Sequence, residues 1–72
     1  MSEFTEDEII FAYRQIGLGR DEVEVVKELV PDNEYPELTA TVLMGELRAW
    51  YRRQTPARLR ELADLPALEL GA

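Results

Sequence analysis

Cysteine and histidine are both missing from this 72-residue sequence. The fold therefore has no disulfide bond and no zinc site built from the usual cysteine and histidine ligands. The same absence removes the commonest general base and the thiol nucleophile from any catalytic scheme. Hydroxyl groups occur, but no histidine is present to activate them; they belong to Ser2, Thr5, Thr39, Thr41 and Thr55. We therefore expect no catalytic residue, no metal site, no cofactor and no enzymatic activity.

Long apolar runs are missing as well, because no stretch approaches the roughly 20 apolar residues of a membrane-spanning helix. The N-terminal segment MSEFTEDE is acidic, whereas a signal peptide begins with basic residues and continues with an apolar run. A cytoplasmic location is the expectation that follows. Apolar residues make up 46% of the sequence, which is typical of a folded globular protein.

Hydrophobic periodicity and helix-end signals predict an all-α fold, a compact bundle of about four short helices with a long third helix at its centre. A chain of this length forms one domain, so residues 1–72 are expected to fold as a single unit. The expected helices span residues 5–16, 21–30, 36–54 and 55–65, and a tail over 66–72 follows them.

The first two helices have clear start signals. Thr5 followed by Glu8 has the spacing of a capping box, and Phe4 with Ile9 has the spacing of a hydrophobic staple. Gly17 is expected to cap the C-terminus of the first helix. Asp21 is a good N-cap for the second helix, although the alternating valines and glutamates of 22–26 leave a strand possible.

The third expected helix carries two apolar stripes. The main stripe consists of Ala40, Leu43, Met44, Leu47, Trp50 and Tyr51. The second stripe consists of Leu38, Val42, Gly45 and Ala49. Two stripes indicate a helix packed on both sides, with Gly45 allowing a close backbone approach. The second stripe packs either within the chain or, as an alternative, along the seam of a homodimer.

Charge is distributed unevenly along a chain whose net charge is −7. Residues 1–47 contain twelve acidic and three basic residues, whereas residues 48–60 contain five arginines and no acid. We name these five arginines the Arg island; they are Arg48, Arg52, Arg53, Arg58 and Arg60. The favoured interpretation is that they pair with the acidic first half of the same domain. The alternatives are an acidic protein partner and a nucleic acid, both of which arginine recognises through charge-assisted hydrogen bonds.

A helix-turn-helix motif is a further possibility for the first two expected helices, because small, apolar and turn residues have suitable spacing there. Its second helix would face phosphates with Asp21, Glu22, Glu24 and Glu28, which have the wrong charge for DNA. Tyr13 also stands where two such helices cross closely and a small residue is usual. DNA reading by this pair is therefore disfavoured.

Phe11 lies on the polar side of the first expected helix, so it is either an exposed interface anchor or buried by a neighbouring helix. The function that fits best is a small non-enzymatic protein-interaction or regulatory module: an inhibitor, an antitoxin-like regulator or an assembly factor. Its expected partner is a protein, and a second copy of the same chain, in a homodimer, is one such partner. Phe11 and the Arg island are the expected partner-binding residues. A nucleic-acid-binding module that uses the Arg island is the alternative.

Overall fold

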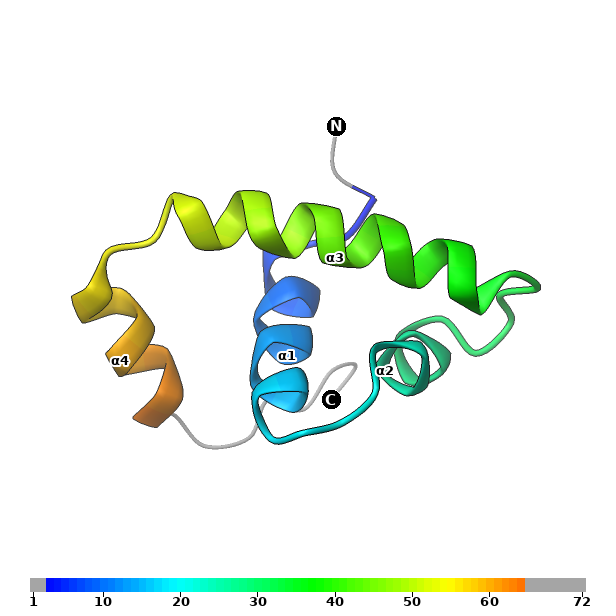
Figure 1. The fold of residues 1–72 in the computed structure, drawn as a ribbon, viewed down its shortest axis with the longest axis horizontal. Coiled ribbons are helices and arrows are strands. Elements are labelled where there is room, and N and C mark those ends of the chain that lie inside the picture. Colours follow the sequence, from blue (N-terminus) through cyan, green and yellow to red (C-terminus); the bar gives the residue numbers. More distant parts are fainter. Residues whose placement is uncertain (1–2, 65–72) are drawn as a thin grey trace.

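The structure is a computed structural model that describes residues 3–64, and in this range it contains four helices and no strand (Figure 1). They are α1 (Glu6–Gly17), α2 (Glu22–Leu29), α3 (Pro36–Arg52) and α4 (Pro56–Asp64). The predicted all-α fold class is confirmed, and each helix boundary lies within two residues of its predicted position. The strand alternative for 22–26 is wrong. The predicted tail over 66–72 lies outside the described residues.

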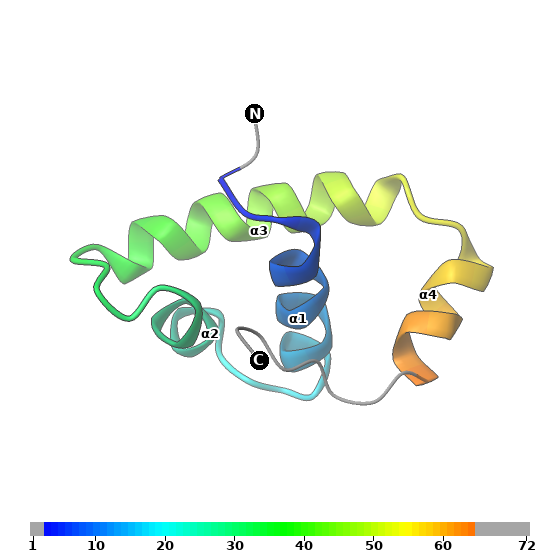
Figure 2. The same cartoon turned by 180° about the vertical axis from the view of Figure 1, so that it is seen from behind.

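The arrangement of the helices places α1 between α2 and α4, and α3 crosses one end of α1 and crosses α2 (Figures 1 and 2). The chain bends after α3, and α4 then runs back beside α1. Helix α3 packs against both α1 and α2, and its other long side forms one side of the bundle. No helix in residues 3–64 has the length and apolar character needed to cross a membrane.

The hydrophobic core draws on all four helices and on the segment before α1. Its most deeply buried large side chains are Trp50 and Leu43 of α3, Leu62 of α4, and Val25 and Val26 of α2. The main apolar stripe of α3 is confirmed at Ala40, Leu43, Leu47 and Trp50, all of which are buried. Phe4 and Ile9, the predicted staple pair, both belong to the same core cluster.

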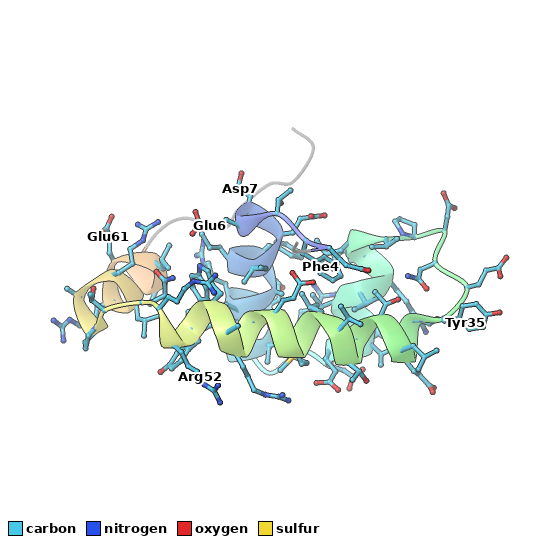
Figure 3. The ribbon with its side chains drawn as sticks, turned by 90° about the horizontal axis from the view of Figure 1, so that it is seen from above. Phe4, Glu6, Asp7, Tyr35, Arg52 and Glu61 are labelled. Carbon is cyan, nitrogen blue, oxygen red and sulfur yellow. The ribbon has the colours of Figure 1, made fainter. Side chains whose placement is uncertain are left out.

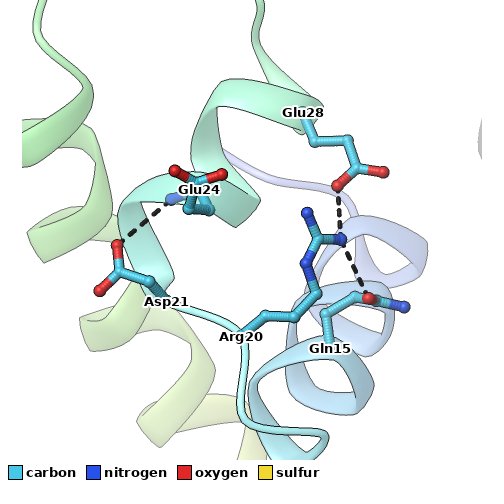
Figure 4. A network of polar contacts seen from close by, with 5 residues as sticks. All are labelled: Gln15, Arg20, Asp21, Glu24 and Glu28. Carbon is cyan, nitrogen blue, oxygen red and sulfur yellow. Dashed lines mark hydrogen bonds and ion pairs between the residues drawn. The ribbon is translucent and has the colours of Figure 1, made fainter.

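Side-chain caps start α1, α2 and α4. In the capping box of α1, the Thr5 N–H donates to Glu8 Oε1 at 2.8 Å and the Glu8 N–H donates to Thr5 Oγ1 at 3.2 Å. Asp21 Oδ2 accepts hydrogen bonds from the N–H groups of Val23 and Glu24 at the start of α2 (Figure 4). The Arg58 N–H donates to Thr55 Oγ1 at 3.1 Å and so caps α4. Each cap satisfies amide groups that the helix itself leaves without an acceptor.

The C-terminal end of α1 differs from the prediction. Gly17 is the last helical residue, and Gly19 is the glycine with positive φ, at 94°. The Gly19 N–H donates to Ile16 O at 2.9 Å and the Arg20 N–H donates to Gln15 O at 3.2 Å, which together form a Schellman motif. In this motif the residue with left-handed backbone angles follows the C-cap residue. The glycine that ends α1 is therefore Gly19, two positions after the predicted Gly17.

The turn between α1 and α2 is held by Arg20 (Figure 4). Its Nη1 atom donates to Gln15 Oε1 at 3.0 Å and forms an ion pair with Glu28 Oε2 at 2.6 Å. Both ion-pair partners are substantially exposed, so the stabilisation is about 1 kcal/mol or less. Through Arg20, the C-terminus of α1 is nevertheless linked to the last turn of α2. These contacts fix the path of the chain between the two helices.

Candidate functional site

One long side of α3 carries apolar residues that no other described part of the chain covers. Tyr35 is 64% exposed, Leu38 is 67% exposed and Val42 is 41% exposed. Gly45 and Ala49 continue the same side of the helix, and both are also exposed. We call these five residues the outer face of α3. The prediction that the second stripe packs within the chain is therefore wrong for the described residues.

Gly45 has no packing role among the described residues. A Cβ atom built at this position meets no heavy atom of residues 3–64 within 4 Å. The predicted close approach of another backbone segment is therefore wrong for this part of the chain. A glycine inside a helix costs about 1 kcal/mol relative to alanine, and here no contact of the chain itself explains that cost.

The Arg island does not pair with the acidic first half of the chain. Of the Arg island, Arg58 forms an ion pair, with Glu61 of its own helix α4 at 3.2 Å. The favoured internal pairing is therefore wrong for residues 3–64. Side chains at positions 48, 52, 53 and 60 are exposed and form no hydrogen bond or ion pair in that range.

The five arginines do not form one continuous strip. Arg48 and Arg52 are four positions apart and share one edge of the outer face of α3. Arg53 caps the C-terminus of α3 on the other edge, and Arg60 belongs to α4. Arg58 is half-buried and pairs with its own helix. Only the arginines of α3 therefore extend the apolar outer face.

Charge separates along α3. Glu34 and Glu37 lie at its N-terminal end, and Arg48, Arg52 and Arg53 lie at its C-terminal end. Figure 3 shows Tyr35 and Arg52 at opposite ends of the helix. This order also complements the helix dipole, which favours acids at the N-terminus and bases at the C-terminus. The outer face is thus an apolar strip with an acidic end and a basic end.

Two hollows open at the surface of the described residues. One of about 390 Å³ is lined by Glu34, Tyr35, Pro36, Glu37 and Leu38, at the acidic end of the outer face. The other, of about 280 Å³, is lined by Tyr13, Arg14, Gly17, Leu18 and Ala63. Neither brings together a nucleophile and a base, and residues 3–64 contain no acidic cluster suited to a metal ion.

The aromatic residues within the Arg island have different environments. Trp50 is only 2% exposed, its ring centroid is 5.4 Å from that of Tyr13, and its Nε1 donates to Glu6 Oε2 at 3.3 Å. Tyr51 is 47% exposed, and its ring centroid lies 6.0 Å from that of Tyr13. Trp50 is thus a core residue, and only Tyr51 offers an aromatic surface beside the arginines.

Phe11 is a core residue, and its prediction as an exposed interface anchor is wrong. Its side chain is 8% exposed, and the buried residues of α1 are the four consecutive positions Ile9, Ile10, Phe11 and Ala12. Four consecutive helical residues span a full turn, so α1 is covered on every side at this level. Phe11 belongs to the same core cluster as buried residues of α2, α3 and α4, which explains why the polar side of α1 is also buried there.

The helix-turn-helix alternative gains no support from the surface of α2. Helices α1 and α2 pack together across a short turn, but the exposed charged residues of α2 are Glu22, Glu24, Lys27 and Glu28. A surface with three acids and one base repels phosphates. That this pair does not read DNA stays a prediction.

Comparison of the chain with protein-family models, with curated proteins and with solved structures gives no match. The functional interpretation therefore depends on the geometry and chemistry of the outer face of α3 and of the arginines beside it.

Proposed function

We propose that this chain is a small, non-enzymatic, cytoplasmic protein-interaction module that binds its protein partner through the outer face of α3. Inhibitors, antitoxin-like regulators and assembly factors are the kinds of protein that work in this way. The observation that supports the proposal is an apolar strip that stays exposed along the whole of α3 and ends beside Arg48 and Arg52.

The composition of this surface is that of a protein interface. Single exposed apolar residues are ordinary, but Leu38 and Val42 lie together on one side of α3, and the exposed Tyr35 directly precedes this helix. Tyrosine and arginine, both present here, are enriched among the residues that dominate binding energy. Arginines at the edge of an apolar strip add orientation through bidentate contacts to carboxylates.

A nucleic acid is the second candidate partner. Arg48, Arg52, Arg53 and Arg60 are exposed, and the half-exposed ring of Tyr51 lies among them in the sequence. Against this candidate, the net charge of −7 opposes approach to a polyanion, and the arginines do not form one strip. We therefore favour a protein partner.

Affinity capture from a native lysate of the source organism tests the proposal. The bait proteins are the wild type, a Leu38→Gln/Val42→Gln variant of the outer face, and a Leu18→Gln control at a leucine that is 78% exposed elsewhere. All three carry the same net charge, so they differ only in apolar surface. We expect the wild type and the control to retain the same protein, with and without nuclease, and the outer-face variant to lose it.

Two results would contradict the proposal. Equal retention of the partner by the Leu38→Gln/Val42→Gln variant would show that another surface binds it. Capture that nuclease abolishes, with an affinity that falls steeply as salt is added, would identify nucleic acid as the ligand.

A further inference from the structure

We infer that a second copy of the same chain covers the outer face of α3, in an antiparallel α3–α3 pair whose twofold axis passes near Val42 and Gly45. The inference rests on the proposed function, because it names the partner of that same surface. Three features support it: the symmetry of the apolar strip, the order of charges along α3 and the placement of Gly45.

The apolar strip is complementary to the same strip of a second copy that lies antiparallel to it. A twofold axis between Val42 and Gly45 places Val42 of one copy opposite Gly45 of the other. The same axis places Leu38 opposite Ala49, because these two residues lie equally far from it along the sequence. Each larger side chain therefore faces a small residue, as interdigitated packing requires.

The charges beside the strip are complementary only in the antiparallel orientation. Glu37 lies on the same edge of α3 as Arg48, and the axis brings Glu37 of one copy near Arg48 of the other. Glu34, just before the helix, comes near Arg52 of the second copy in the same way. None of these four side chains has a hydrogen bond or ion pair within residues 3–64. A parallel pair would bring the acidic ends of the two helices together and the basic ends together, which is unfavourable.

Gly45 gains a role in this arrangement. It lies at the middle of the outer face, and a Cβ atom there would meet no atom of residues 3–64 within 4 Å. At the crossing point of two helices, a missing side chain lets the backbones approach closely, which is how glycine serves in other helix pairs. The second copy thus supplies the contact that the single chain lacks.

The size of the contact sets the expected affinity. Helix α3 has 17 residues, so it is about 25 Å long. A contact made by one helix from each copy lies at the small end of specific protein interfaces. We therefore expect a dissociation constant in the micromolar range, and the dimer must be sought at concentrations up to about 500 μM.

A charge-swap experiment, read by sedimentation equilibrium of the full chain, tests the antiparallel pair. One variant is Glu34→Lys/Glu37→Lys and the other is Arg48→Glu/Arg52→Glu. All four positions are exposed, so both variants are expected to fold, which far-UV circular dichroism checks. We expect the wild type to dimerise, each variant alone to dimerise at least about tenfold more weakly, and the equimolar mixture of the two to recover a dimer.

Matched controls separate a local effect from a change in net charge. Glu22→Lys/Glu24→Lys and Lys27→Glu/Arg60→Glu change the net charge by the same amounts at exposed positions away from the outer face. Both controls should dimerise nearly as the wild type does. If they weaken the dimer as much as the swap variants do, the inference is wrong.

The outcomes also separate this inference from the proposed function. A wild type that stays monomeric at about 500 μM overturns the second copy as the partner. In that case the proposed function still stands if the wild type captures some other protein from the lysate and the Leu38→Gln/Val42→Gln variant does not. A mixture of swap variants that stays monomeric while the wild type dimerises shows that the copies meet through another surface, and this overturns the inference as well.

Discussion

Replacing Trp50 by alanine is expected to lower the free energy of unfolding by about 3–5 kcal/mol. Trp50 is among the largest fully buried side chains, and it contacts Tyr13 and hydrogen-bonds to Glu6 of α1. Its loss leaves a cavity between α1 and α3 that the remaining side chains only partly fill. A domain of this size has a stability of about 3–5 kcal/mol, so the variant should be largely unfolded at room temperature.

Tyr51 is the matched control, because it is the next residue along α3 and is 47% exposed. Tyr51→Ala should cost about 1 kcal/mol, the value of an exposed aromatic contact. Urea unfolding followed by far-UV circular dichroism measures both variants, since the only tryptophan is lost in one of them. A Trp50→Ala variant that unfolds within about 1 kcal/mol of the wild type would contradict the core described for α3.

Replacing Phe11 by alanine is expected to destabilise the fold by about 3–5 kcal/mol, the usual cost of removing a buried phenylalanine. The expectation follows from a side chain that is 8% exposed within the core cluster. If Phe11 were instead an interface anchor, its truncation would weaken partner binding and leave the stability unchanged. The substitution therefore distinguishes the two alternatives that the sequence left open.

The matched control for Phe11 is Leu18→Ala, at a leucine of the α1 cap that is 78% exposed. Its free energy of unfolding should stay within about 0.5 kcal/mol of the wild type, as for most surface substitutions. Thermal and urea unfolding measure both variants. Equal stability of Phe11→Ala and Leu18→Ala would restore Phe11 as a surface residue.

Local interactions explain why the helices were predictable. The capping box of Thr5 and Glu8, the Asp21 cap and the Thr55 cap each join residues two or three positions apart. Such contacts are encoded in a short stretch of sequence and depend little on the rest of the fold. The end of α1 was misplaced because two glycines, Gly17 and Gly19, compete for one role. Only the hydrogen bonds of the turn decide between them.

The position of a helix in the bundle explains what the sequence left undecided. Helices α1 and α3 both carry apolar residues on two sides. The second side of α1 is buried at Phe11, which belongs to the core cluster, whereas the second side of α3 stays exposed at Leu38 and Val42 because α3 forms one side of the bundle. Periodicity shows that a side is apolar, but it does not show what covers that side.

The Arg island illustrates the same limit for charge. In the sequence, five arginines follow an acidic first half, and this order predicted that the arginines pair with the acids of that half. Pairing requires side chains to meet within about 4 Å, and Arg48 and Arg52 instead share the solvent side of α3. That they share this side of α3 with Leu38, Val42 and Gly45 became clear only once the exposed side of α3 was known.

Backbone amide chemical shifts of nitrogen-15-labelled protein, recorded as its concentration rises from about 20 to about 500 μM, test binding through α3 most directly. With a second copy on the outer face, the signals of Leu38, Val42 and Gly45 should move together and report a micromolar dissociation constant. The signals of Glu22 and Lys27 on α2 should stay in place. Shifts confined to α2, or no shift anywhere along α3, would contradict the second copy of the chain as the partner of the outer face.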